Sequence, residues 1–127
     1  MSINYNITDK FGQLLISTVR DRVVNEIANI INGKQKGYIV KELDGFSDAQ
    51  KKDLLNLSSW AIIQTLSYFF FMLDDYESEV RLEFFDDESN MFIDLTEASD
   101  GLTGDMLSKY GWISRYSKII IDEQFRY

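Results

Sequence analysis

Carboxylates are the side chains of this 127-residue chain most able to do chemistry, because the chain has no histidine and no cysteine. These absences remove the commonest general base and the thiolate nucleophile, which leaves a carboxylate pair, a Ser–Lys arrangement or a tyrosine. A pair such as Asp75 and Glu79 could serve as the acid and base of glycoside hydrolysis. A catalytic pair would lie in a cleft with one strongly raised pKa. We favour an ordinary solvated helix end and expect no enzymatic activity.

Five consecutive polar residues, 86–90, could supply oxygen ligands to a metal ion. Their sequence is Asp-Asp-Glu-Ser-Asn, and oxygen atoms of this kind are the ligands that Ca²⁺ and Mg²⁺ take. A calcium loop also needs alternating ligands, a central glycine and a distal glutamate, which are not in register here. We therefore interpret the segment as a solvated turn and expect no metal ion and no cofactor.

Acidic residues are concentrated in one segment, residues 74–100. The segment contains eleven of the 21 carboxylates and one of the 13 basic residues, Arg81, so its net charge is −10. The rest of the chain sums to +2, and the whole chain to −8. A field of this kind affects the choice of partner and the rate of association more than the fold. Binding to nucleic acid is disfavoured, because phosphate contacts need clustered lysine and arginine.

The candidate binding residues are the carboxylates of this segment and the aromatic residues near them. Phe85 and Phe92 share a strand face that carries charge, and Trp112 lies off the apolar pattern of its helix, so each could be an exposed anchor. A helix that covered that face would bury them instead, and both options remain open. The residues predicted to bind a partner are Asp74, Asp75, Glu77, Glu79, Glu83, Phe85, Asp86, Asp87, Glu88, Phe92, Asp94 and Trp112.

The spacing of apolar residues indicates the elements that position this surface. Over residues 9–32 apolar residues recur at steps of three and four, which is typical of an amphipathic helix. Thr8 is its expected N-cap, and Gly33 its expected stop. Residues 37–46 are ambiguous between a short strand and an irregular crossing, although Asp44-Gly45 favours a turn.

A second helix is predicted over residues 47–74, beginning at a capping box formed by Ser47 and Gln50. Its second half is apolar nearly all round, which indicates a central helix covered on several sides. A membrane span usually needs ~20 mostly apolar residues, and residues 57–73 are shorter and include several polar side chains, so we prefer a buried core helix. The aromatic residues assigned to the core are Trp60, Tyr68, Phe69, Phe70 and Phe71.

The period of the pattern changes to two from residue 79 onwards. It predicts two short antiparallel strands on either side of the acidic turn, one face packed on the helices and the other carrying Glu83, Phe85, Phe92 and Asp94. A third helix is predicted over residues 103–118, with a break at Gly111, although residues 119–121 could form a terminal strand. The expected fold is mainly α (α+β). It is a single domain over residues 1–127, in which helices surround a central hydrophobic helix and carry a small antiparallel β-hairpin.

An acidic domain of this size, with an anionic patch beside aromatic residues, resembles the immunity proteins that bacteria make against their own toxins. These include the immunity proteins of contact-dependent inhibition and other polymorphic toxin systems. The resemblance is to the class, without a defining family motif, and rests chiefly on residues 74–79 (Asp-Asp-Tyr-Glu-Ser-Glu) and 84–88 (Phe-Phe-Asp-Asp-Glu). It implies that the partner is a cognate basic toxin domain, often a nuclease, whose active site is blocked, with no nucleic acid and no membrane bound.

An acidic adaptor or regulatory subunit that docks a basic partner without inhibiting it fits the same pattern. A DNA-mimicking antirestriction protein fits less well, because its carboxylates should spread over most of the molecule. The absence of cysteine favours a reducing compartment, and the first residues show no basic start followed by an apolar run. We therefore expect a cytoplasmic protein without a secretory signal, and the inhibitor and adaptor hypotheses both remain open.

Overall fold

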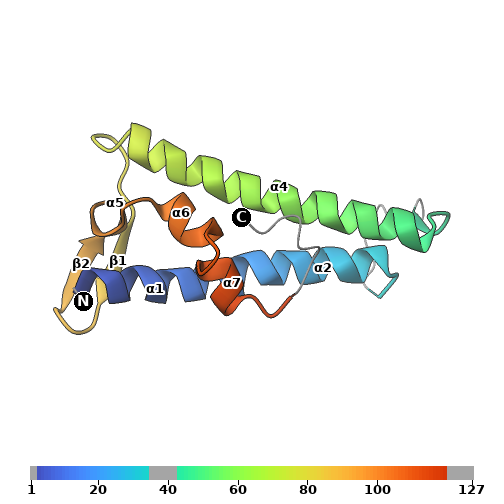
Figure 1. The fold of residues 1–127 in the computed structure, drawn as a ribbon, viewed down its shortest axis with the longest axis horizontal. Coiled ribbons are helices and arrows are strands. Elements are labelled where there is room, and N and C mark those ends of the chain that lie inside the picture. Colours follow the sequence, from blue (N-terminus) through green and yellow to red (C-terminus); the bar gives the residue numbers. More distant parts are fainter. Residues whose placement is uncertain (1–2, 35–42, 120–127) are drawn as a thin grey trace.

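Two long helical segments run alongside each other and set the shape of the molecule (Figure 1). In this computed structural model the described residues are 3–34 and 43–119. The first segment consists of α1 (Ile3–Leu15), the π-helical turn η1 (Ile16–Arg20) and α2 (Asp21–Ile31), and the second is α4 (Asp48–Asp75). The chain then forms an antiparallel sheet of β1 (Glu83–Asp86) and β2 (Met91–Asp94), followed by α5 (Leu95–Ala98), α6 (Leu102–Leu107) and α7 (Trp112–Tyr116). The mainly α fold with a small antiparallel hairpin is therefore confirmed.

The first helical segment begins earlier than the apolar spacing predicted. Thr8 lies inside α1, so its assignment as the N-cap is wrong. The reason is that Ile7 is buried one turn before Phe11, so the apolar stripe extends toward the N-terminus. The predicted stop is confirmed, because Gly33 has a φ of +73° and its N–H donates to the carbonyl of Ile30 at 3.1 Å. A positive φ at this position is the usual helix-ending role of glycine.

The start of α4 follows from local sequence. Asp44 and Gly45 form the expected turn, whereas residues 37–42 of the ambiguous segment lie outside the described residues. Ser47 then caps the helix as predicted. Its hydroxyl accepts a hydrogen bond from the backbone N–H of Gln50 at 3.1 Å, and its own N–H donates to the Gln50 side-chain oxygen at 2.8 Å. Together these bonds satisfy backbone donors that a helix start leaves unpaired.

The core lies on one side of α4, and the prediction of a helix covered on several sides is wrong. Ile63, Phe70 and Leu73 are buried on that side. Of the five aromatic residues assigned to the core only Phe70 is buried, and the exposed ones are Trp60, Tyr68, Phe69 and Phe71. The other helices all lie on one side of α4 in Figure 1, so they can bury one face of it.

An aromatic cluster in the core joins α1, α4, β1 and α7. The ring of Phe11 makes edge-to-face contacts with Phe70, Phe84 and Trp112, at centroid distances of 6.5, 6.0 and 5.7 Å. Trp112 packs on the backbone of α1 at Gly12, where an added Cβ would lie 2.3 Å from the indole. Trp112 is therefore 1 % exposed, and the expectation that it could be an exposed anchor is corrected.

The hairpin packs one face on this core. The register pairs Phe84 with Ile93, both partly buried against the core, and pairs Phe85 with Phe92 on the opposite face. β1 begins at Glu83 rather than near residue 79, because the backbone N–H groups of residues 79 and 80 both donate to the carbonyl of Tyr76 in a turn. The strand pairing and its two faces agree with the predicted alternation.

The predicted third helix is divided into two short ones. The division falls at residues 108–111, and the predicted break at Gly111 is confirmed. A Cβ at Gly111 would lie 2.5 Å from the backbone oxygen of Asp105, so only glycine fits this tight connection. The preceding helix α5 was not predicted from the sequence. Of the alternative terminal strand, Ile119 has no regular structure and residues 120 and 121 lie outside the described residues.

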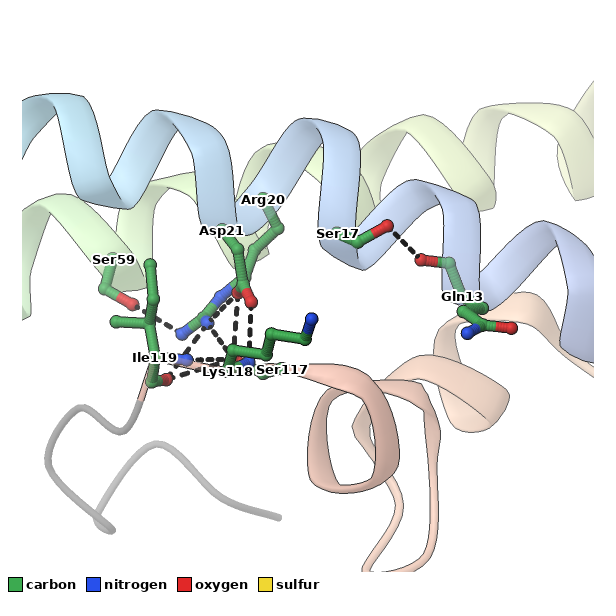
Figure 2. A network of polar contacts seen from close by, with 8 residues as sticks. All are labelled: Gln13, Ser17, Arg20, Asp21, Ser59, Ser117, Lys118 and Ile119. Carbon is green, nitrogen blue, oxygen red and sulfur yellow. Dashed lines mark hydrogen bonds and ion pairs between the residues drawn. The ribbon is translucent and has the colours of Figure 1, made fainter.

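A buried ion pair holds the residues after α7 against the long helices (Figure 2). A guanidinium nitrogen (Nη1) of Arg20 lies 2.6 Å from a carboxylate oxygen of Asp21 and donates to the hydroxyl of Ser117 at 2.7 Å. The backbone N–H of Lys118 donates to the other Asp21 oxygen at 2.8 Å, and Nη2 of Arg20 reaches the hydroxyl of Ser59 on α4 at 3.4 Å. One charge pair therefore joins the first segment, α4 and the chain after α7.

Candidate protein-binding surface

Most of the acidic segment lies at one end of the molecule. Figure 1 shows the last turn of α4, the connection to β1 and the hairpin following one another there. Of the carboxylates predicted to bind a partner, those exposed at this end are Asp74, Asp75, Glu77, Glu79, Glu83, Asp87 and Glu88. We refer to these seven residues, together with Asp94, Phe85 and Phe92, as the acidic end.

Two exposed aromatic rings lie among these carboxylates. Phe85 and Phe92 face each other across the two strands, 41 % and 64 % exposed, and their rings make an edge-to-face contact at 5.2 Å. The same register places Glu83 opposite Asp94 on this strand face. Because the other face of the hairpin is packed on the core, the rings and carboxylates are held in place before any partner binds. The prediction of an aromatic, charged strand face is confirmed.

Arg81, the single basic residue of the segment, lies between two of the carboxylates. Its guanidinium is 3.2 Å from an oxygen of Glu83 and 3.6 Å from an oxygen of Asp94. Glu83, through its hydrogen bond and its charge, and then Asp94 raise the pKa of Arg81. A shallow hollow of about 380 Å³ beside it is lined by Glu77, Glu97 and neighbouring residues. Arg81 thus reduces the negative charge of the strand face and leaves the carboxylates of residues 74–79 uncompensated by a base within the segment.

Asp86 does not belong to this surface, contrary to the prediction. It is 2 % exposed, and its carboxylate accepts hydrogen bonds from the hydroxyl of Ser89 at 2.8 Å and from the backbone N–H groups of Glu88 and Ser89 at 3.3 Å each. The Ser89 hydroxyl is the main cause of a lowered pKa at Asp86, which burial opposes. Asp86 shares the inward strand face with Phe84, so the period of two already placed it there. Its role is to hold the hairpin turn.

Replacing Asp86 by alanine is expected to lower the thermal midpoint of unfolding, because the turn loses its three hydrogen bonds. A carboxylate whose pKa is lowered by folding stabilises the protein at pH values above its ordinary pKa of 3.8. This stabilisation is lost as the pH falls through the lowered pKa of the folded protein. The difference between wild type and variant should therefore be full near about pH 7 and shrink near about pH 3. Thermal scans at both pH values measure it. Asp87→Ala, at the exposed neighbour, is the control, and equal effects of the two variants would contradict this role.

A second group of carboxylates lies in a cleft that the sequence did not indicate. The cleft has a volume of about 430 Å³, and its lining includes Asp9 of α1, Asp100, Asp105 of α6 and Arg115 of α7. Burial raises the pKa of Asp105, the Ser99 hydroxyl that donates to it opposes this, and the charges of Asp9 and Asp100 add to the rise. Arg115 donates to Asp9 at 2.7 Å. This bond joins α7 to α1, and the cleft also includes residues of α6. Segments that are distant in the sequence and meet only in the fold leave no local motif.

The carboxylates considered for chemistry from the sequence are arranged differently. Asp75 and Glu79 are both exposed, near the end of α4 and in the turn after it. Over residues 3–34 and 43–119, no group of three or more carboxylates is placed so that it could hold a metal ion. Comparison with protein-family models, with curated proteins and with solved structures gave no match to this chain. The acidic end must therefore be interpreted from its own residues.

Proposed function

We propose that this protein is an immunity-type inhibitor that binds a basic bacterial toxin domain, a nuclease, through the acidic end and performs no chemistry itself. The observation that carries the proposal is the exposed pair of Phe85 and Phe92, held on a packed hairpin and surrounded by carboxylates. Exposed aromatic rings within a charged surface are the usual anchors of a protein interface.

The charge of the acidic end suits a cationic groove. A nuclease groove binds phosphate through basic side chains, and a negative protein surface competes with nucleic acid for that groove and is steered rapidly onto it. The aromatic pair adds short-range contact area that the carboxylates lack. Ordering a side chain on binding costs about 0.5–1.5 kcal/mol, and a prefolded hairpin avoids part of this loss.

Capture of the partner from the source cell tests this proposal. Immobilised wild-type protein is expected to retain a basic protein with nuclease activity, identified by mass spectrometry. A Phe85→Ala/Phe92→Ala double variant should lose it. Tyr110→Ala removes a ring that is 76 % exposed outside the acidic end and should retain it, which makes it a matched control. Retention of the same protein by the double variant, or capture of an acidic protein instead, would contradict the proposal.

Reversing two exposed charges should slow association with that partner. Changing Asp87 and Glu88 to lysine removes favourable long-range attraction, so we expect the association rate at low salt to fall roughly tenfold and to depend less on salt. Asp86 is left unchanged because it holds the turn. The control reverses Glu26 and Asp44, exposed carboxylates outside the acidic end, with the same change in net charge. Surface plasmon resonance at several salt concentrations measures the rates, and equal rates for both variants would remove the hairpin turn from the interface.

A further inference from the structure

One face of α4 exposes an apolar stripe that no element within residues 3–34 and 43–119 covers. Its residues recur at steps of three and four, and we define the α4 stripe as Leu57, Trp60, Gln64, Tyr68 and Phe71. The four apolar members are 59 %, 39 %, 68 % and 46 % exposed in that order. The stripe extends over about 21 Å at the rise of an α-helix. No charged side chain occurs between residues 54 and 73.

The position of α4 explains why this face has no covering element within the described residues. The ribbon in Figure 1 has α4 along one edge of the molecule, with α1, α2, α6 and α7 on one side of it. By length and composition α4 is also the one helix within residues 3–34 and 43–119 that could cross a membrane, and 28 % of its most apolar stretch is buried. Large exposed apolar patches of this kind mark sites of interaction.

Acidic residues continue the stripe at both ends. Asp53 lies one helical step before Leu57, and Asp75 lies one helical step after Phe71, and both are exposed. Lys51 and Lys52 lie off the stripe, on the side of α4 that faces α2, where they line a hollow. The surface is therefore apolar in the middle and negative at each end.

This charge pattern disfavours two possible occupants. In a dimer with a second copy, antiparallel stripes centred on Gln64 would place Asp53 opposite Asp75, and parallel stripes would place each aspartate opposite itself. Like charges that face each other across a helix pair are repulsive. A helix that lies on a membrane usually carries lysine and arginine beside its apolar face, and an anionic leaflet would repel aspartates there.

We propose that the α4 stripe is a docking site for an amphipathic helix of a partner protein, with an apolar face and basic residues at both ends of that face. Apolar residues at steps of three and four are the surface that such a helix recognises. The basic ends would pair with Asp53 and Asp75. The inference does not depend on the nature of the partner bound at the acidic end, although Asp75 belongs to both surfaces.

Synthetic peptides test the proposal directly. The probe is a helical peptide of about 21 residues, leucine at the core heptad positions and a lysine pair at each end, compared with a matched peptide that ends in glutamate pairs. Binding should shift the fluorescence of Trp60 to shorter wavelength, while Trp112 is already buried. At low salt we expect the lysine peptide to bind at least about tenfold more tightly.

Variants of the stripe complete the experiment. Leu57→Asn/Tyr68→Asn should abolish binding of the lysine peptide with only a small decrease in the thermal midpoint, because both side chains are mostly exposed and asparagine is a somewhat weaker helix former. Leu14→Asn, at a leucine of α1 that is 49 % exposed, should leave binding unchanged. Equal binding of both peptides, or of neither, overturns the proposal. It is also overturned if anionic vesicles shift the Trp60 emission, or if the protein sediments as a dimer that the stripe variant disperses.

Discussion

Replacing Phe70 by alanine is expected to lower the free energy of unfolding by about 3–5 kcal/mol, the usual cost of truncating a buried phenylalanine. The Phe70 ring is 1 % exposed and makes edge-to-face contacts with Phe11 and Trp112, at 6.5 and 6.2 Å. Its removal leaves a cavity where three parts of the chain meet. Because domains of ordinary stability unfold at a cost of about 5–15 kcal/mol, the loss is a large part of the total.

The adjacent Phe69 provides the matched control. It is the same residue type on the same helix and is 44 % exposed. Phe69→Ala should therefore lower the free energy of unfolding by much less than Phe70→Ala does. Urea unfolding followed by circular dichroism measures both free energies. If the two variants lose equal stability, the assignment of the inner face of α4 is wrong.

Replacing Asp21 by alanine should be comparably damaging, by about 3–5 kcal/mol, because it leaves the Arg20 guanidinium buried without its counter-charge. The two side chains are 4 % and 10 % exposed, and among the described residues Nε of Arg20 already has no hydrogen-bond partner. The variant also removes the acceptors of Ser117 and Lys118. The chain after α7 should therefore detach from the long helices before the rest of the protein unfolds.

An exposed ion pair on the next turn of the same segment is the control for Asp21. Arg22 and Glu26 are 75 % and 52 % exposed and lie 4.0 Å apart, so Glu26→Ala should cost about 0–1 kcal/mol. Unfolding in urea measures the difference, and hydrogen exchange at residues 117–119 reports local detachment. An Asp21→Ala variant as stable as Glu26→Ala would show that the pair has no structural role.

Local signals predicted much of the fold. The capping box at Ser47, the glycine stop at Gly33 and the break at Gly111 depend on residues close by in the chain, so local sequence was enough to predict them. The period of two in the hairpin also fixed its two faces. The burial of α4 could not be predicted in the same way, because a helix with apolar residues nearly all round has no periodic contrast to indicate which side is covered.

The acidic end was predicted in part. The exposed Phe85–Phe92 pair follows from strand alternation, and the same rule, applied to Asp86, would have placed that carboxylate inward. The burial of Trp112 depends on its contact with Gly12, which is far away along the chain, and α7 is too short for its own periodicity to show a buried side. The cleft around Asp105 likewise joins segments that share no local motif.

The survival of cells that produce the toxin domain encoded beside this gene tests the central claim most directly. We expect cells to grow when the wild-type protein or the Tyr110→Ala control is co-expressed. We expect no growth with the Phe85→Ala/Phe92→Ala variant at equal protein levels. An adaptor that binds the same domain away from its active site would not restore growth. Cells that die despite the wild-type protein, a neighbouring product that is harmless by itself, or full protection by the double variant would contradict the account.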